Sequence, residues 1–183
     1  MLTERLKEQT KTNHQLLEKK LVGKMRSMRS NNDYADLLSL FYKYFGGLEK
    51  AIAKHLDESL IPDYPARRKA SSLAADLIEM GATVPPIASI YELPVIHSHP
   101  QALGALYVIE GSTLGGKIIS KMISHQLPST NGHGLTFFNS YGENTIEMWE
   151  RFKLILDGPA NLPGDDVIRA ANETFIKFNH YFD

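Results

Sequence analysis

The chain has 183 residues, 43% of them hydrophobic and 22% charged, and a formal net charge of −1. This length and composition are typical of a soluble globular protein, and the small net charge does not suggest binding to nucleic acid or to an anionic membrane. No apolar run has the length of a membrane span, and the charged N-terminal sequence MLTERLKEQTK lacks an apolar signal core. The absence of cysteine excludes disulfides, thiolate metal ligands and a cysteine nucleophile. These features predict a cytoplasmic protein.

Hydrophobic residues recur with helical spacing along most of the chain. The first helix is expected to have Thr3 as its N-cap, and its apolar positions are recognised up to Leu21. A second helix is expected to open at 31–33 and to extend through Ile52, and a third to end at 80–81. Prolines at 85, 86 and 94 then predict irregular structure through about Pro100.

Helical spacing returns over residues 101–125. The next segment, 128–142, is rich in Gly, Ser, Thr and Asn and is expected to form a long loop. Two more helical patterns start near Ile146 and Val167, and the chain shows neither an internal repeat nor a domain linker. The sequence therefore predicts a single all-α domain over residues 1–183, with about six to eight helices.

The stretch 111–117, GSTLGGK, has the glycine and lysine spacing of a phosphate-binding P-loop. A P-loop follows a strand and has Ser or Thr after its lysine to hold Mg²⁺. Here Ile118 follows the lysine, and the flanking apolar residues have helical spacing. Because no other alternation of strands and helices is predicted, a nucleotide site is disfavoured.

Glycines inside a helix need another reason, since each costs about 1 kcal/mol relative to alanine. Gly111 and Gly115 are four residues apart and lie on one helical face, and Gly104 lies near the same face. A face without side chains permits either close packing of another helix or the approach of a flat ligand, and the sequence leaves both open. The pair Gly115-Gly116 would also permit a kink.

His14 has more informative neighbours than the other six histidines. Lys7, Thr10 and Lys11 precede it on adjoining parts of one helical face, and Glu18 follows one turn later, within reach of an imidazole N–H. A lone histidine in a helix is more often structural. With two lysines for carboxylates and a glycine-lined helix elsewhere, however, this histidine fits haem, whose iron takes an imidazole ligand and whose propionates attract cations.

Four segments of the chain resemble the haem oxygenases (heme oxygenases), particularly the bacterial branch that supplies biliverdin. KEQTKTNHQLLE is similar to the proximal helix of the family, and LYVIEGSTLGG to its distal helix. RRKASSLAADL and ANETFIKF are similar to its third and closing helices, so that the resemblance covers essentially the whole chain. It implies haem held between the first and the distal helix, and oxidative cleavage of haem to biliverdin with release of iron and carbon monoxide.

The resemblance also implies roles for individual residues. His14 corresponds to the axial ligand of the iron, and Glu18 to its outer partner. The other residues implied to bind haem are Lys7, Thr10, Lys11, Phe175 and Lys153, with Arg151 as an alternative to Lys153. Gly111, Ser112 and Gly115 correspond to the distal wall, where oxygen reacts. Animal members of the family have an aspartate in place of Ser112 to organise water, so the resemblance leaves open how water is held here.

Haem is then both cofactor and substrate, and the reaction needs O₂ and an external electron donor such as a ferredoxin or an NAD(P)H-dependent reductase. A redox donor protein is expected as a partner, with a biliverdin-using photoreceptor as an optional one, and neither nucleic acid nor membrane is expected. The alternative function is a non-catalytic haem carrier or sensor on the same fold. Thiaminase-like relatives are disfavoured because they need a cysteine, and quinone-cofactor synthases of this architecture would bind no haem.

Overall fold

The computed structural model describes residues 1–56, 59–158 and 162–183, and this part of the chain is helical, without strands. Seven α-helices are present: α1 (Leu2–Ser27), α2 (Asn31–Ile52), α3 (Ser71–Glu79), α4 (His99–Gln126), α5 (Thr136–Asn139), α6 (Thr145–Asp157) and α7 (Gly164–Asn179). The predicted all-α class and helix number are confirmed. Among the described helices, none combines the length and hydrophobicity needed to cross a membrane.

The starts of the first two helices show how local sequence and tertiary contacts compete. Helix α2 begins where expected, because Ser30 accepts a hydrogen bond from the Asp33 amide while the Asp33 carboxylate accepts one from the Ser30 amide. The predicted N-cap Thr3 is wrong, since α1 already begins at Leu2. The Thr3 amide and hydroxyl instead donate to the carboxylate of Asp157 at the end of α6, at 3.0 and 2.6 Å.

The segment 128–142 is less irregular than its composition suggested, because it contains α5 and a short 3₁₀ turn, Pro128–Thr130, and a second 3₁₀ turn begins at its last residue. The Asp76 carboxylate of α3 accepts hydrogen bonds from the amides of Thr136 and Phe137, at 3.0 and 2.8 Å. The side chains of Phe137 and Phe138 are both buried. A buried pair of phenylalanines and a carboxylate from another helix thus order a stretch that is rich in turn-forming residues.

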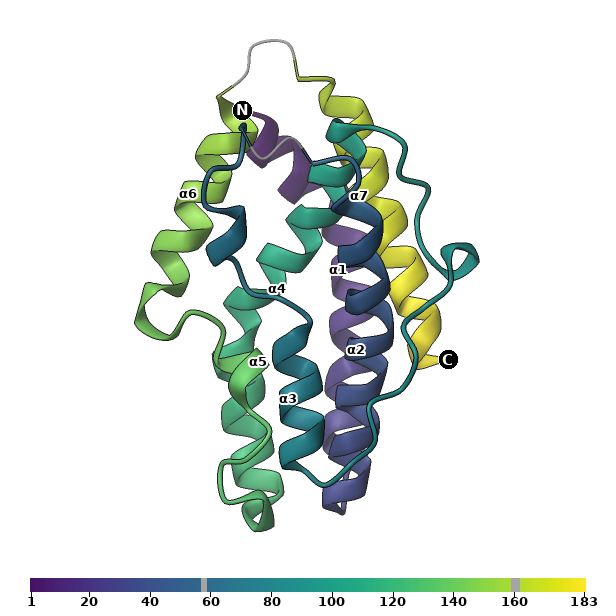
Figure 1. Ribbon diagram of the computed structural model, residues 1–183, viewed down its shortest axis with the longest axis vertical. Coiled ribbons are helices and arrows are strands. Elements are labelled where there is room, and N and C mark those ends of the chain that lie inside the picture. The colour runs from purple at the N-terminus through teal and green to yellow at the C-terminus, as the bar shows by residue number, and fades with distance from the viewer. Residues whose placement is uncertain (57–58, 159–161) are drawn as a thin grey trace.

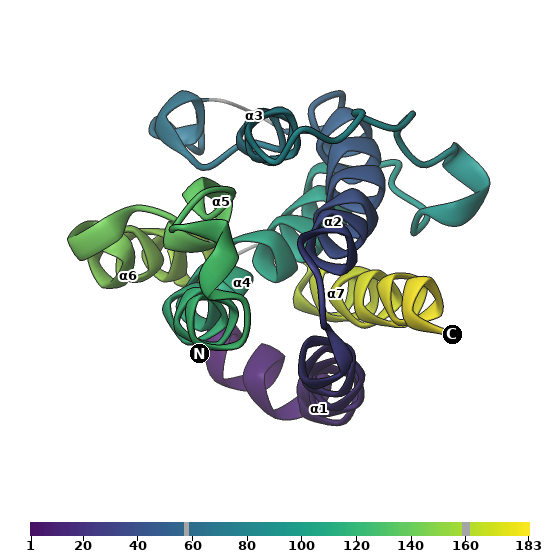
Figure 2. The same cartoon turned by 90° about the horizontal axis from the view of Figure 1, so that it is seen from below.

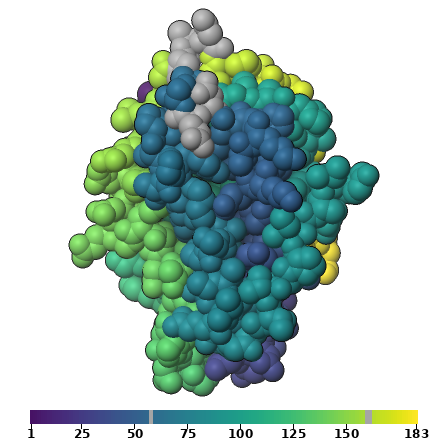
Figure 3. All heavy atoms as spheres, in the orientation of Figure 1, coloured from purple at the N-terminus to yellow at the C-terminus, as the bar shows by residue number. Residues whose placement is uncertain are grey.

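Helix α4 passes through the middle of the molecule, and the other long helices are arranged around it (Figure 1). Seen along the bundle, α1 lies on one side of α4 beside α7, whereas α3 and α5 lie on the opposite side (Figure 2). The middle of the face in Figure 3 is formed by α2 and α3, and α5 and α6 form one side of it. Helix α4 therefore has one side toward α1 and another toward α3 and α5.

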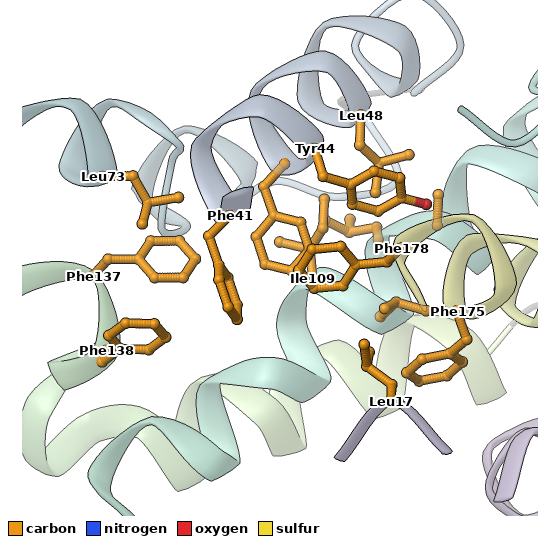
Figure 4. Close-up of a cluster of buried hydrophobic side chains, with 14 of the residues drawn as sticks. Leu17, Phe41, Tyr44, Leu48, Leu73, Ile109, Phe137, Phe138, Phe175 and Phe178 are labelled. Carbon is orange, nitrogen blue, oxygen red and sulfur yellow. The ribbon is translucent and has the colours of Figure 1, made fainter. Parts of the chain in front are cut away.

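An aromatic cluster forms much of the core. Phe41 makes edge contacts with several rings, and Tyr44 stacks on Phe178 with ring centroids 4.6 Å apart. The Tyr44 hydroxyl donates to the carbonyl of Thr174 at 2.7 Å, which satisfies its buried polar atom. Figure 4 shows the cluster extending from Phe137 and Phe138 at one end to Phe175 and Leu17 at the other. The core thereby reaches the helix that carries His14.

Candidate functional site

Helices α1 and α4 are joined near both ends of the region in which they run beside each other. At one end the side chains of Thr10 and Tyr107 share a hydrogen bond. At the other end the Gln126 side-chain amide donates to the carbonyls of Arg26 and Met28, at 3.0 and 2.9 Å. Several side chains along the facing stripes of the two helices stay exposed or half-exposed. We call these residues the α1–α4 face: Lys7, Lys11, His14 and Glu18 of α1, and Gly111, Leu114, Gly115 and Ile118 of α4.

The His14 imidazole is exposed on this face and contacts one aromatic neighbour. Its ring meets the edge of Phe175 from α7, with centroids 5.6 Å apart and planes at 71°. Phe175 itself is buried, with 6% of its surface exposed. Within the described residues, neither ring nitrogen of His14 has a hydrogen-bond partner, and Glu18, one turn away, is also exposed and makes no bond to it. The structure thus leaves this imidazole available to a ligand.

The candidate cations differ in what they contact. Lys7 and Lys11 are exposed, and in the part of the chain that the structure describes neither is in an ion pair. Lys153 is half-buried and pairs with Glu150 at 2.8 Å, and Arg151 pairs with Glu147 at 2.6 Å. Because Lys7 and Lys11 lie one turn apart on the stripe that carries His14, they form the better-placed pair of free positive charges.

Two glycines of α4 serve close packing. A methyl group added at Gly104 would lie 2.2 Å from the carbonyl oxygen of Val167 in α7. One added at Gly116 would lie 1.9 Å from the carbonyl oxygen of Phe138 in α5. Both distances are far shorter than any real contact, so these two positions admit no side chain. Close packing, one of the two explanations left open by the sequence, accounts for this pair.

Gly111 and Gly115 are different. A methyl group at Gly111 would meet only the Trp149 ring, at an ordinary 3.8 Å, and one at Gly115 would have no neighbour within 4 Å. Next to them, Leu114 and Ile118 have 39% and 65% of their surfaces exposed. Helix α4 continues through this region as an uninterrupted α-helix and changes direction along its course (Figure 1). The packing of the protein itself does not require glycine at these two positions.

The α1–α4 face suits a flat, anionic, iron-containing ligand. It offers an unpaired imidazole, two unpaired ammonium groups and a smooth apolar wall, which are the groups that haem needs. Among the described residues no group of three or more His, Asp or Glu side chains is arranged to hold a metal ion alone. A single histidine suffices for haem, because the porphyrin supplies the other four nitrogens. Surface hollows of about 390 and 210 Å³ lie elsewhere and include none of the predicted site residues.

Ser112 points to the opposite side of α4 from the α1–α4 face. Its hydroxyl donates to the carbonyl of Ile109 at 2.6 Å and accepts from the Arg68 guanidinium at 2.5 Å. Arg68 lies just before α3, and the sequence alone gave no sign that it contacts α4. Of the residues assigned to the distal wall, the structure thus brings Gly111 and Gly115 to the face and turns Ser112 away from it.

A buried ion pair adjoins this contact and was also missed. Glu110, with 1% of its surface exposed, accepts hydrogen bonds from Arg67 at 2.7 Å and from the Tyr141 hydroxyl at 3.0 Å. Burial raises the pKa of Tyr141, so the phenol stays protonated and donates. Arg67 also binds the Asp63 carboxylate in a bidentate manner. Glu110 stands between the apolar run 102–109 and the glycines that follow it. A carboxylate at such a position was the sequence signal that could have indicated a buried partner.

Comparisons with known proteins identify the family and the fold of this chain. A family model described as heme oxygenase matches residues 1–183. A heme oxygenase of Xanthomonas campestris pv. campestris is 32% identical over 128 residues, which cover 68% of this chain and 72% of that protein. The heme oxygenase PigA of Pseudomonas aeruginosa is 28% identical over 99% of this chain and 89% of its own length. A crystal structure of the NO- and CO-bound heme oxygenase of Neisseria meningitidis has a TM-score of 0.79 at 23% identity, covers 100% of this chain and 90% of its own, and thereby shows the same fold.

Proposed function

The chain belongs to the haem oxygenase family, whose members cleave haem to biliverdin with O₂, and from that premise we propose that it binds haem on the α1–α4 face with His14 as the iron ligand. The protein is accordingly an enzyme of haem cleavage. The observation that carries the proposal for the site is the exposed, unpaired imidazole of His14 beside two open glycines on the neighbouring helix.

The side chains around His14 have separate tasks in this proposal. Lys7 and Lys11 bind the propionates, because they are unpaired and lie on the same stripe of α1. Phe175 holds the imidazole ring from the core side. Thr10 keeps α1 at a fixed separation from α4 through its bond to Tyr107. Glu18, one turn beyond His14, is within reach of the imidazole N–H once the ring is coordinated.

The α4 side of the α1–α4 face, opposite His14, contributes to binding through its shape. Gly111 and Gly115 leave a strip of bare backbone on α4, and this strip would admit the flat surface of a haem. Leu114 and Ile118 are exposed beside this strip, and their apolar side chains would exclude water from the edges of a haem bound there. Bound haem supplies both the iron that activates O₂ and the ring that is cleaved. The protein contributes position and exclusion of solvent, and it needs no nucleophilic side chain.

The remaining requirements come from outside the chain. Electrons come from a redox donor protein such as a ferredoxin or an NAD(P)H-dependent reductase, and iron and carbon monoxide leave with biliverdin. Lys153 is a further cation for the propionates if Glu150 releases it. The protein acts in the cytoplasm as one domain over residues 1–183, and a biliverdin-using photoreceptor is an optional recipient of the product.

Titration of the apoprotein with hemin, followed by addition of a reductant under air, tests this proposal. The wild type should give a sharp Soret band with one equivalent of hemin, and a biliverdin spectrum after reduction. His14→Ala should lose the coordinated spectrum and turnover, whereas His125→Ala, which removes an exposed histidine of α4, should keep both. A wild-type complex that binds hemin but never yields biliverdin would indicate a carrier, and absence of hemin binding would refute the site altogether.

A further inference from the structure

Asn172 of α7 holds the turn of α1 that comes directly before His14. Its side-chain amide donates to the backbone carbonyl of Gln9 at 3.2 Å, and its side-chain oxygen accepts from the amide of the Asn13 side chain at 2.6 Å. A third hydrogen bond, to the carbonyl of Ile168 at 3.2 Å, fixes the Asn172 side chain against its own helix. Both N–H groups and the oxygen of this side-chain amide are therefore used.

The same turn of α1 is held from another side by α4. Thr10, which is buried, shares a hydrogen bond with Tyr107 of α4. Helices α4 and α7 both border α1 when the bundle is seen along its length (Figure 2). The turn 9–13 is therefore fastened on two sides, and these contacts oppose rotation of α1 about its own axis just before His14.

Two ion pairs lie toward the ends of the same seam between α1 and the C-terminal part of the chain. Arg5 pairs with Asp165 at 2.5 Å, and Lys20 pairs with Asp183. The side chains of both pairs are exposed or half-exposed, so water and salt weaken them. The hydrogen bonds of Asn172 lie between these pairs in a half-buried position, where water competes less. Asn172 is thus the polar contact best placed to fix the middle of α1 against α7.

A small rotation of α1 would displace the candidate iron ligand. Side-chain atoms at the surface of an α-helix lie about 5–6 Å from its axis, so a rotation of α1 by about 10° moves them by about 1 Å. A displacement of that size in a reacting group can lower a rate by up to about a hundredfold. The contact of His14 with Phe175 is apolar and does not fix a direction, whereas the hydrogen bonds of Asn172 do.

We propose that Asn172 is a positioning residue for haem cleavage, which fixes the rotation of α1 and thereby the direction in which the His14 imidazole faces the iron. This inference rests on the proposed coordination of haem by His14. Asn172 acts through Gln9 and Asn13 and does not itself touch the substrate. Removal of groups that orient a metal ligand commonly lowers metal affinity or activity by about 10- to 100-fold.

The test needs a measurement that follows the imidazole itself as well as turnover. The iron–imidazole stretching band of the reduced haem complex, recorded by resonance Raman spectroscopy in the absence of O₂, depends on the orientation of the ring. This band is recorded first for the wild type and for His14→Ala. A wild type without the band, or a His14→Ala protein that keeps it, would refute the assignment of the iron ligand, and with it this inference, before any variant of Asn172 is interpreted.

Asn172→Leu keeps nearly the shape of the side chain but removes its hydrogen bonds. It should shift or broaden the iron–imidazole band and lower turnover about tenfold. Arg5→Met is the control, because it breaks an exposed contact between the same two helices, and it should match the wild type in both measurements. The double variant Asn13→Leu/Asn172→Leu replaces both amides by apolar groups, which can leave stability nearly unchanged. It should unfold close to the urea concentration of the wild type while its band and turnover remain altered.

Two outcomes would overturn the proposal. The first is a folded, hemin-binding Asn172→Leu protein with the band and the turnover of the wild type. The second is a double variant whose band and turnover return to wild-type values together with its stability, because Asn172 would then contribute only to the fold. If Asn172→Leu does not fold, Asn13→Leu decides: it removes one of the bonds from the α1 side and should change the band and lower turnover at least about threefold. Wild-type values of both in Asn13→Leu would refute the proposal.

Discussion

The imidazole of His14 on α1 and the phenyl ring of Phe175 on α7 meet edge to face, with their centroids 5.6 Å apart. Phe175 lies at the end of the aromatic core, next to Leu17, and the candidate iron ligand thereby rests against this core (Figure 4). An exposed imidazole needs such support, because a histidine that rotates freely loses entropy when it coordinates a metal.

Phe175→Leu should therefore weaken hemin binding more than it weakens the fold. The change keeps an apolar side chain, and we expect it to lower the free energy of unfolding by about 1–2 kcal/mol while hemin affinity falls several-fold. The matched control is Phe178→Leu, which changes the same core one turn later but makes no ring contact with His14. Both proteins are compared by urea unfolding and hemin titration. Equal affinity losses in the two variants would show that the ring contact has no specific role.

Adjacent glycines of α4 should respond in opposite ways to alanine. At Gly115 the added methyl has no neighbour within 4 Å, so Gly115→Ala should stabilise the apoprotein by up to about 1 kcal/mol through helix propensity. At Gly116 it would collide with the Phe138 carbonyl, and we expect a loss of roughly 3 kcal/mol, because two backbone segments must separate. Urea denaturation of both apoproteins measures this contrast.

Variants of Gly115 distinguish the two explanations for glycine in this helix, which are close packing of another helix and the approach of a flat ligand. If haem lies against Gly115, the stabilised Gly115→Ala protein should bind hemin less tightly and turn over more slowly, and Gly115→Leu should lose turnover. A Gly115→Leu protein with wild-type turnover would show that the substrate does not approach this part of α4.

Salt dependence should identify the lysines that hold the propionates. Lys11→Ala removes an unpaired ammonium on the stripe of His14, and we expect hemin affinity to fall about three- to tenfold at low ionic strength, and less in 1 M salt. Lys19→Ala is the control, since this exposed lysine lies on the same helix but five residues after His14, on another face. Affinities are compared by fluorescence quenching of Trp149. The prediction fails if both variants lose the same affinity.

The helices were predictable because their apolar spacing is local, and so was the stripe from Lys7 to Glu18, which follows from helical geometry once α1 is assigned. Glycine spacing correctly placed Gly111 and Gly115 on a common face. It did not separate them from Gly104 and Gly116, because that distinction depends on the carbonyl groups of α7 and α5, which meet α4 only in the folded chain.

Contacts between residues that are distant in the sequence could not be predicted from local patterns. Arg68 and Ser112 are 44 residues apart, and nothing in either local pattern relates them. Helix α5 was missed for a similar reason, since Asp76 caps it from 60 residues away while its own residues resemble a loop. Hydrogen bonds between distant segments depend on the tertiary structure, and local propensity is overridden by them.

A pH-dependent contact between α3 and the chain before α5 gives a last prediction. The Glu79 carboxylate accepts from the Gly134 amide at 2.7 Å and lies 2.7 Å from the His133 imidazole. The hydrogen bond from Gly134, and then that from His133, hold the pKa of Glu79 below its ordinary value. A carboxyl whose pKa is lowered by folding stabilises the protein above its unfolded pKa, and this contribution disappears as the pH falls through the folded pKa.

The unfolding free energies of the wild type and Glu79→Gln should therefore differ at pH 6 and converge toward pH 3. Asp76, on the same helix, has a pKa that is raised mainly by burial, so its own contribution has the opposite sign, but it is present in both proteins and cancels in the difference. Glu143→Gln, at an exposed carboxylate without a described partner, is the control and should follow the wild type throughout. Urea unfolding from pH 3 to 7 measures all three, and a constant difference between wild type and Glu79→Gln would show that ionisation of Glu79 does not hold this segment.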